Sequence, residues 1–261
     1  MIRINSTRCI RCGLCARVCL VHCFHMADNA VTVRHEEHCL RCGQCTAVCP
    51  VGAVHLNGTD PDTLAPVQDF PAAESLAALI RGRRSIRSFK DESVPRETLL
   101  QALDIVRYAP TGKNLENVRW LVLEGRPALR RAADAMVNLF RGEKSMAVLV
   151  AAHDRGEDPI FRGAPCAVFA CAEGAYDLDI VNCSIAVASL DLLLPTMGLG
   201  ACWAGYAMRA AALDERVRRA MDVDETLRPM AGLMVGFPVL RYQRIPERQA
   251  LRVRFAHEEQ A

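Results

Sequence analysis

Eight cysteines lie in two short stretches near the start of the chain, and both stretches have the same spacing. "CIRCGLCARVC" runs from Cys9 to Cys19 and "CLRCGQCTAVC" from Cys39 to Cys49, each with gaps of two, two and three residues. Three thiolates at the shorter interval can bind one face of a cubane [4Fe–4S] cluster from a single tight loop. The fourth cysteine is then directed to the other cluster. The spacing therefore predicts two [4Fe–4S] clusters that cross-link the two stretches.

On this pattern each cluster takes three ligands from one stretch and one from the other. The predicted ligands of the first cluster are Cys9, Cys12, Cys15 and Cys49. The predicted ligands of the second cluster are Cys39, Cys42, Cys45 and Cys19. Gly13 and Gly43 follow the second cysteine of each stretch, where a glycine lets the backbone turn closely around inorganic sulfide.

Zinc sites and disulfide bonds are the alternative uses of such cysteines. Zinc sites usually pair two C-x-x-C knuckles across a spacer and leave no role for a third cysteine at the same interval. Disulfides need an oxidising compartment, and the opening "MIRINSTRC" lacks the apolar core of a secretory signal. We therefore expect iron–sulfur clusters in a cytoplasmic protein. Cys23 is an alternative to Cys19 as a ligand, because the first stretch departs from the pattern at this point. Cys49 is followed by Pro50, whereas Cys19 is followed by Leu20.

A second group of chemically capable residues lies in "RGRRSIRSF", from Arg81 to Phe89. Its four arginines surround a serine where a predicted helix gives way to a loop. Guanidinium forks and a hydroxyl group together suit a phosphate monoester. A solvated basic patch or a nucleic-acid contact has the same composition, so this stretch alone does not decide between them.

The third candidate stretch, "APTGKNLENVRWLVL", begins at Ala109 and leads into a predicted strand. Pro110 and Gly112 predict a loop. Within it, Lys113 offers a charge, and Asn114 offers both a donor and an acceptor. Such an amide suits the imide-like edge of a pyrimidine ring, so the stretch is a candidate flavin contact.

Four stretches, in this order, resemble the nitroreductase superfamily of FMN-binding oxidoreductases. They are "RRSIRSF", "APTGKNLENVRW", "GLGACWAG" and "VGFP…RIPERQAL", and the resemblance runs over about residues 73 to 255. The cysteine stretches resemble the bacterial two-cluster ferredoxins. The whole chain is thus similar to the ferredoxin–nitroreductase fusions of anaerobic bacteria and archaea.

This resemblance implies a homodimer with two FMN molecules at the subunit interface. Carried over position by position, it assigns FMN contacts to Arg83, Arg84, Ser85, Arg87, Pro110, Thr111, Gly112, Asn114, Cys202, Trp203, Ala204, Gly205 and Arg248. The loop around Asn114 often reaches from the other subunit in this family, and "CWAG" matches a turn near the flavin N5. Arg244 is a weaker candidate for the phosphate. Glu116 and Asn117 replace the family's frequent Gln-Pro and leave a negative charge near the flavin.

The elements that must position these residues divide the chain into three parts. We predict a two-cluster ferredoxin domain over residues 1–57, a linker over 58–72 and a nitroreductase-like FMN domain over 73–261. In the last part, helical spacing of apolar residues predicts helices over 72–83, 96–109, 127–140 and 177–198. Short continuous apolar runs predict strands over 119–124, 146–152, 166–172 and 230–238. The predicted fold class is α+β, with a ferredoxin-like module followed by a nitroreductase-like α+β domain.

Composition excludes several partners. A formal net charge of +2 gives no electrostatic reason to bind nucleic acid. The longest apolar stretch, residues 185–208, is interrupted by Asp191 and Pro195, so we expect no membrane segment. His153 is predicted to be a loop residue rather than a proton donor at the flavin. Four further cysteines in apolar surroundings are predicted to be buried and unreactive: Cys166, Cys171, Cys183 and Cys202.

The sequence thus predicts an oxidoreductase with its own electron path. Electrons from a ferredoxin-like or other low-potential donor are expected to reach FMN through the clusters and to pass to a small organic acceptor of nitroaromatic, quinone or enone type. No Rossmann fingerprint is present, although NAD(P)H can stack on an open flavin. The alternative is an electron-transfer or redox-sensing partner whose FMN only stores electrons for a larger complex.

Overall fold

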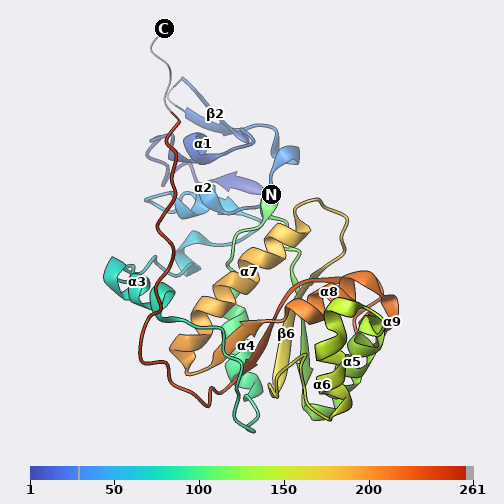
Figure 1. The fold of residues 1–261 in the computed structure, drawn as a ribbon. Coiled ribbons are helices and arrows are strands. Elements are labelled where there is room, and N and C mark those ends of the chain that lie inside the picture. Colours follow the sequence, from blue (N-terminus) through green and yellow to red (C-terminus); the bar gives the residue numbers. More distant parts are fainter. Residues whose placement is uncertain (29, 257–261) are drawn as a thin grey trace.

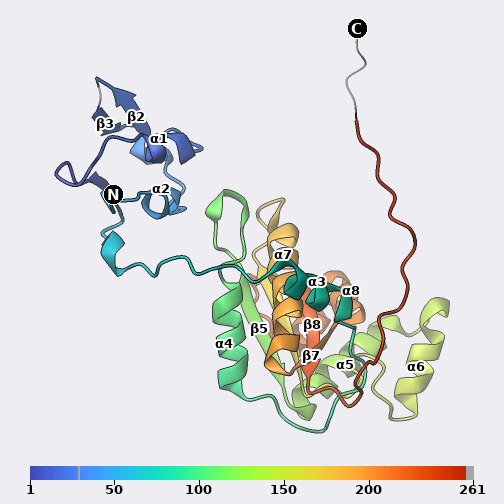
Figure 2. The ribbon, with the colours of Figure 1, turned by 90° about the vertical axis from the view of Figure 1, so that its left-hand side faces the viewer.

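The computed structural model describes residues 1–28 and 30–256. In Figure 1 and Figure 2 the amino-terminal module and the larger carboxy-terminal domain are separate bodies joined by an extended segment. Nine α-helices and eight strands are found in the described residues, together with five short 3-10 helices.

The amino-terminal module consists of two small antiparallel sheets, two short α-helices and a 3-10 helix. Its strands are β1 (Ile2–Ile4), β2 (Phe24–Ala27), β3 (Ala30–Val33) and β4 (Val54–Leu56). Its helices are α1 (Leu14–Val18), α2 (Gln44–Ala47) and the 3-10 helix η1 (Glu36–His38). β1 pairs with β4 and β2 pairs with β3, so the first and last strands of the module meet.

The two halves of this module repeat with an offset of 30 residues, as Cys9 and Cys39 show. Gly13 and Gly43 precede α1 and α2 in the left-handed region, with φ of 74° and 71°. A residue with a Cβ is strained in this conformation, so the two glycines let each cysteine loop turn into its helix. The buried cluster of the module is small and includes Cys15 and Cys45. So small a core gains little stability from burial alone, which is consistent with a need for metal.

The first part of the predicted linker is attached to the amino-terminal module. Asp62, within the 3-10 helix η2 (Pro61–Thr63), forms a two-point ion pair with Arg8 at 2.8 and 2.9 Å. From residue 64 to residue 72 the chain has no helix or strand and is exposed. Residues 64–72 are thus the extended part of the predicted linker.

The carboxy-terminal domain is a four-stranded antiparallel sheet with helices on both faces. Its strands are β5 (Arg119–Glu124), β6 (Cys166–Ala172), β7 (Gly200–Trp203) and β8 (Arg228–Gly236). Its helices are α3 (Ala73–Gly82), α4 (Arg96–Val106), α5 (Arg126–Phe140), α6 (Ala147–Asp154), α7 (Asp179–Leu193), α8 (Gly205–Leu213) and α9 (Glu215–Ala220). Short 3-10 helices complete it: η3 (Gly112–Asn114), η4 (Lys144–Met146) and η5 (Leu194–Met197). The strand order is β5-β6-β8-β7, and the fold is α+β as predicted.

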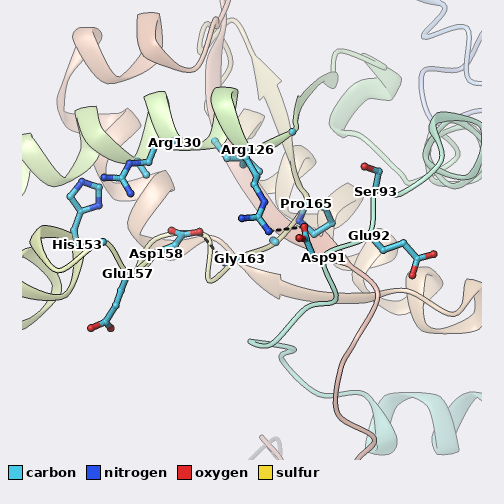
Figure 3. Close-up of a pocket in the computed structure, with 15 residues that line it drawn as sticks. Asp91, Glu92, Ser93, Arg126, Arg130, His153, Glu157, Asp158, Gly163 and Pro165 are labelled. Carbon is cyan, nitrogen blue, oxygen red and sulfur yellow. Dashed lines mark hydrogen bonds and ion pairs between the residues drawn. The ribbon is translucent and has the colours of Figure 1, made fainter.

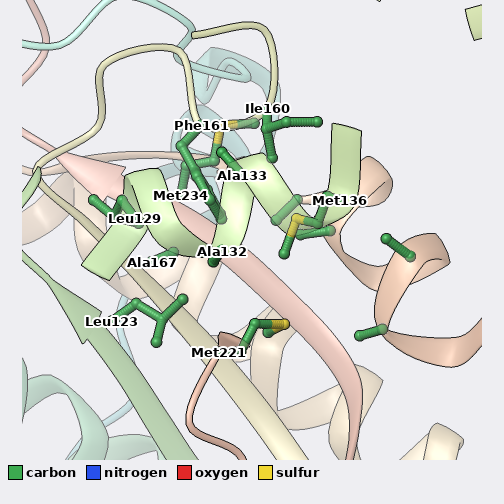
Figure 4. Packing of buried hydrophobic residues seen from close by; sticks show 14 of the residues in the cluster. Leu123, Leu129, Ala132, Ala133, Met136, Ile160, Phe161, Ala167, Met221 and Met234 are labelled. Atoms are coloured by element: carbon green, nitrogen blue, oxygen red, sulfur yellow. The ribbon is translucent and has the colours of Figure 1, made fainter. Parts of the chain in front are cut away.

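Alternate residues of β6 contribute to two different cores. Val168 and Ala170 pack with α4 and α7 on one face of the sheet. Phe169 and Cys171 face α5, α6, α8 and α9 on the other face, where the cluster of Figure 4 lies. This alternation is the two-residue period of a strand, and burial on both faces explains why β6 reads as a continuous apolar run.

One predicted strand is wrong. Residues 146–152, "MAVLVAA", begin the helix α6 (Ala147–Asp154) after Met146. Leu149, Ala152 and His153 are its buried residues, a helical spacing, whereas Val148 is 84% exposed. A short apolar run can be a strand or a buried helix, and periodicity alone does not separate them. His153 accordingly lies in a helix rather than in the predicted loop.

One helical stretch, Asp179–Met197, is long and apolar enough to cross a membrane by length and composition. It comprises α7 and η5, and it packs against β6 and β8 as the core helix of the carboxy-terminal domain. Asp179, Asn182 and Asp191 are buried polar residues on it. Core helices of globular domains commonly have this composition, so the stretch is weak support for a membrane span.

Candidate functional site

Two small cavities in the amino-terminal module gather the eight predicted cluster ligands. One cavity is lined by Cys9, Cys12, Cys15 and Cys49. The other is lined by Cys19, Cys39, Cys42 and Cys45, and also by Cys23. Each cavity thus combines three cysteines of one stretch with the last cysteine of the other. This is the exchange of ligands that the sequence pattern predicts.

Cys23 lies beside Cys19, and the equivalent residue in the other half of the module shows which contact this position makes. The backbone N–H of Cys23 donates to the Sγ of Cys19 at 3.2 Å, and that of Ala53 donates to the Sγ of Cys49 at 3.2 Å. Cys23 therefore occupies the place of Ala53 in the other half. Burial, together with the neighbouring Cys19, raises the pKa of the Cys23 thiol to about 12. The geometry favours Cys19 as the ligand and Cys23 as a small buried residue that donates to it.

The donor set fits iron–sulfur clusters chemically. Burial raises the pKa of the Cys15 and Cys45 thiols, so each needs a nearby positive charge to be held as a thiolate. A metal ion supplies that charge and deprotonates a coordinating thiol outright. Backbone N–H groups already point at three of the other sulfurs, those of Cys19, Cys39 and Cys49. Such hydrogen bonds stabilise cluster-bound thiolates and tune the reduction potential.

The arginine stretch of the carboxy-terminal domain lies alongside β7. Ser85 forms a parallel bridge with Ala201, and the backbone N–H of Ile86 donates to the carbonyl of Ala201 at 2.9 Å. Gly200 makes this approach possible, because a Cβ there would lie 2.5 Å from Cγ1 of Ile86. The predicted flavin stretches that begin at Arg83 and at Cys202 are therefore neighbours in space.

Arg83 is fixed by a buried carboxylate of α7. Its Nη2 lies 3.1 Å from Oδ2 of Asp191, a residue that is 6% exposed. Burial raises the pKa of Asp191, whereas the charge of Arg83 and a hydrogen bond from Trp203 lower it. The Nε atoms of Arg83 and Arg84 are buried and have no partner among the described residues. Unpaired buried donors are costly, so both arginines are suited to an anionic ligand such as a phosphate.

The loop from Pro110 to Asn114 is fixed by the other end of α7. Asn182 accepts a hydrogen bond from the backbone N–H of Gly112 at 2.9 Å. Asn182 also donates to Asn117 at 3.3 Å, and Asn117 donates to Asp179 at 2.6 Å. The side chains of Asp179 and Asn182 are both buried. This network positions the loop, and it gives Asn117 a structural role where the family often has proline.

Glu116 closes the same loop on itself. Its carboxylate accepts from the side-chain amide of Asn114 at 3.0 Å, and its backbone N–H donates to the hydroxyl of Thr111 at 3.0 Å. Lys113, Asn114 and Glu116 all have positive φ, between 48° and 53°. Several such residues in succession indicate a backbone held in an uncommon conformation, which is frequent at binding sites. The negative charge anticipated near the flavin therefore lies directly against the predicted flavin contact, Asn114.

The remaining predicted flavin residues differ in their burial and in how near they lie to the other candidate residues. Cys202 and Ala204 are buried at the end of β7 and the start of α8, while Trp203 and Gly205 are exposed beside them. Arg87 is exposed. Arg248 and Arg244 lie in the exposed segment after β8, which has no helix or strand through residue 256 and runs away from the sheet in Figure 2. No described hydrogen bond or ion pair joins Arg248 or Arg244 to the other candidate residues.

Sequence reasoning missed the three polar residues of α7 that hold the flavin stretches. Asp179, Asn182 and Asp191 carry hydrogen bonds or an ion pair to those stretches, as described above. The signal was present, because each carries a carboxylate or an amide in a helix that is otherwise apolar apart from two serines. Buried polar groups need partners, so such residues indicate contacts that the helix must make.

A cavity of about 460 Å³ lies away from the predicted flavin stretches. Figure 3 shows it between the start of α5, the segment around Asp91 and the loop that follows α6. His153 lines it and forms a 2.9 Å contact with Asp134. None of the residues assigned to FMN by resemblance lines this cavity. His153 is thus not placed as a proton donor to the predicted flavin site.

The four cysteines of the carboxy-terminal domain are buried, as predicted. Burial raises the pKa of Cys166, Cys171 and Cys183 to about 12. Thiols in this state are inert as nucleophiles.

Known proteins named as nitroreductases or nitrobenzoate reductases resemble part of this chain. A 4-nitrobenzoate reductase of Nocardioides sp. (strain LMS-CY) is 39% identical over 72 residues, which are 27% of this chain and 29% of that protein. The match thus spans less than a third of that relative. A putative NADH dehydrogenase/NAD(P)H nitroreductase of Methanothermobacter thermautotrophicus is 25% identical over 164 residues, 61% of this chain and 75% of that protein.

Solved structures share the fold of the carboxy-terminal domain. A nitroreductase with bound FMN from Bacteroides fragilis superposes with a TM-score of 0.59 at 18% identity, covering 69% of this chain and 98% of that one. An iodotyrosine deiodinase bound to FMN and 3-iodo-L-tyrosine gives 0.56 at 24% identity, covering 70% and 99%.

Family profiles match the two parts separately. The 4Fe-4S dicluster domain matches residues 8–53, over the two cysteine stretches. The nitroreductase family matches residues 80–237, which include the arginine stretch, the Asn114 loop and the "CWAG" turn. The chain therefore belongs to the nitroreductase family of FMN-dependent oxidoreductases and carries a 4Fe-4S dicluster domain ahead of it.

Proposed function

We propose that this chain is an iron–sulfur flavoprotein oxidoreductase. It passes electrons from a low-potential donor through two [4Fe–4S] clusters to FMN and on to a small organic acceptor of nitroaromatic, quinone or enone type. Residues 1–57 form the ferredoxin domain, residues 58–72 the linker and residues 73–261 the FMN domain. The protein acts in the cytoplasm, where its thiols stay reduced.

The observation that carries the proposal is the sorting of eight thiols into two sets of four. Each cavity of the amino-terminal module is lined by one complete predicted ligand set. Two [4Fe–4S] clusters held by interleaved ligands are an electron path rather than a catalytic centre. A domain of this kind next to a nitroreductase fold supports electron delivery to that fold.

Two groups of residues in the FMN domain are proposed to bind different parts of the flavin. Arg83, Arg84 and Ser85 offer a cation pair and a hydroxyl to the phosphate end of the cofactor. Thr111, Gly112 and Asn114 lie in the loop that offers polar groups to the ring. FMN, when bound, supplies both one-electron and two-electron chemistry, which suits a donor that delivers electrons singly.

A homodimer accounts for the separation of these groups. Arg83 contacts Asp191 and the loop contacts Asn182, and these two positions lie nine residues apart on α7, about 14 Å along the helix axis. A twofold axis near α7 would bring the loop of one protomer towards the arginines of its partner. Three apolar side chains of α7 are exposed in the single chain, Ile180, Val181 and Ile185, which supports a partner surface there.

An anaerobic steady-state assay tests the proposal. Reduced ferredoxin serves as donor, and nitroaromatics, quinones and enones are the acceptors. Wild-type protein should turn over at least one acceptor. A Cys42→Ser variant that retains FMN should lose ferredoxin-driven turnover and keep turnover when dithionite is the reductant.

Two outcomes would contradict the proposal. Equal ferredoxin-driven rates in wild type and Cys42→Ser would remove the clusters from the path. Rapid flavin reduction without turnover of any acceptor would favour the alternative, a carrier whose FMN only stores electrons.

A further inference from the structure

α7 buries a single carboxylate at its carboxy-terminal half. Asp191 is 6% exposed and lies next to Leu190 and near Leu194, both fully buried. A buried carboxylate is costly unless it is paired, and a well-packed apolar residue in its place is often neutral or stabilising. Packing alone therefore gives no reason for an aspartate here.

The partner of this carboxylate is a residue of the predicted flavin site. Oδ2 of Asp191 lies 3.1 Å from Nη2 of Arg83, and Arg83 is the only described cation in ion-pair distance of it. Arg83 directly follows α3 and opens the stretch that runs beside β7. Its side chain has no other described hydrogen bond, so the ion pair is what fixes the guanidinium at this point.

The ion pair leaves Arg83 able to bind a ligand. A guanidinium has five N–H donors in a planar fork, and Asp191 engages one terminal nitrogen. Nε of Arg83 is buried without a described partner, as is Nε of the adjacent Arg84. A guanidinium that is already fixed by an ion pair loses less side-chain entropy when it binds a ligand than a mobile guanidinium does.

The stretch that Arg83 opens also contacts the second flavin stretch. The backbone N–H of Ile86 donates to the carbonyl of Ala201 at 2.9 Å, directly before "CWAG". The position of Arg83 is thus linked through the backbone to the turn after β7.

We propose that Asp191 is a positioning residue of the flavin site, which holds the guanidinium of Arg83 in the orientation that receives FMN. This inference rests on the proposed FMN function. It assigns Asp191 no contact with the flavin, only an action through Arg83.

The test is a double-mutant cycle on FMN affinity. Cluster-loaded protein freed of FMN is titrated with FMN, and the quenching of flavin fluorescence gives the dissociation constant for Asp191→Asn, Arg83→Gln and the double variant. We expect each single change to weaken binding by about tenfold or more. The double variant should bind no more weakly than Arg83→Gln alone, because Asp191 acts only through Arg83.

Conservative and remote variants complete the design. Asp191→Glu keeps the charge and should restore part of the affinity. Asp222→Asn, at an exposed position with no described side-chain bond, should leave affinity unchanged. If Asp191→Asn fails to fold, Asp191→Glu replaces it in the cycle. Asp191→Glu alone should weaken FMN binding relative to wild type. Added to Arg83→Gln, it should cause no further weakening.

The failures of the two proposals are distinguishable. Two outcomes overturn only the role of Asp191 and leave the flavin site standing. In one, the affinity losses of the two single variants multiply in the double variant. In the other, Arg83→Gln binds FMN more weakly while Asp191→Asn binds it as tightly as wild type. An Arg83→Gln variant that binds FMN as tightly as wild type overturns the flavin site itself, and the inference with it.

Discussion

The backbone N–H of Cys23 donates to the Sγ of Cys19 at 3.2 Å, in the arrangement that Ala53 and Cys49 form in the other half of the module. The extra cysteine of the first stretch therefore supports a ligand by its backbone. Its own thiol, which also lines the cavity of the second ligand set, donates to the carbonyl of His35 at 3.5 Å.

Replacing Cys23 by alanine should leave both clusters in place. The backbone N–H remains, and alanine already occupies the equivalent position in the other half. Cys19→Ser should lose about half of the iron, because serine removes a thiolate ligand of one cluster. Iron and sulfide analysis of anaerobically purified variants measures this. Iron lost equally in both variants would make Cys23 a ligand.

Gly200→Ala should weaken FMN binding by about tenfold. The new Cβ would lie 2.5 Å from Cγ1 and 3.0 Å from Cβ of Ile86, and overpacking of this kind costs about 1–3 kcal/mol. The arginine stretch would have to move away from β7. A second change, Ile86→Ala, removes the closest contact, that with Cγ1, but keeps Cβ, so it should restore part of the affinity. Fluorescence titration with FMN checks both, and an unaffected Gly200→Ala variant would show that this contact does not position the site.

Asn182→Leu should disorder the Asn114 loop without affecting the clusters. The backbone N–H of Gly112 would lose its acceptor, at a cost of about 1–3 kcal/mol. We expect FMN affinity to fall by about tenfold and the iron content to stay constant. Ser189→Ala is a matched control on the same helix, because its hydroxyl bonds only the carbonyl of Ile185. Equal affinities in the two variants would contradict the role of Asn182.

Glu116→Gln should raise the midpoint potential of bound FMN. It removes a negative charge 3.0 Å from Asn114, the predicted flavin contact, and so favours the reduced, anionic flavin. At an effective dielectric near 20 the interaction is roughly 1–2 kcal/mol, or about 20–40 mV for a two-electron couple. Spectroelectrochemical titration measures the shift. A potential that falls or stays constant would place Glu116 away from the flavin of the assembled protein.

Much of the fold was predictable because its signals are local. The strands over Arg119–Glu124 and Cys166–Ala172 were predicted with correct bounds, and the helices around Leu99 and Met136 lie where apolar spacing placed them. The cysteine spacing predicted which four thiols meet, although the last cysteine of each set lies 20 to 40 residues from the other three, because cluster geometry constrains them. The strand predicted over residues 146–152 was wrong, since an alanine-rich apolar run fits a helix equally well.

The contacts that position the flavin stretches were not predictable from local pattern, although the polar residues of α7 that make them stand out in the sequence. Asp191 and Asn182 are distant in sequence from Arg83 and Gly112, and only the packing of α7 on the sheet brings each pair together. Gly200 likewise reads as part of a turn until the approach of Ile86 is known. A long-range contact between two single polar residues leaves no repeating pattern in the sequence from which it can be predicted.

The central claim is that two clusters and one flavin share each chain. Elemental and cofactor analysis of anaerobically purified protein, together with its ultraviolet–visible spectrum, tests this most directly. The account predicts about eight irons and one FMN per chain, with flavin bands on a broad iron–sulfur absorption. Folded protein that is colourless, or that holds zinc in place of iron and binds no FMN, would contradict it.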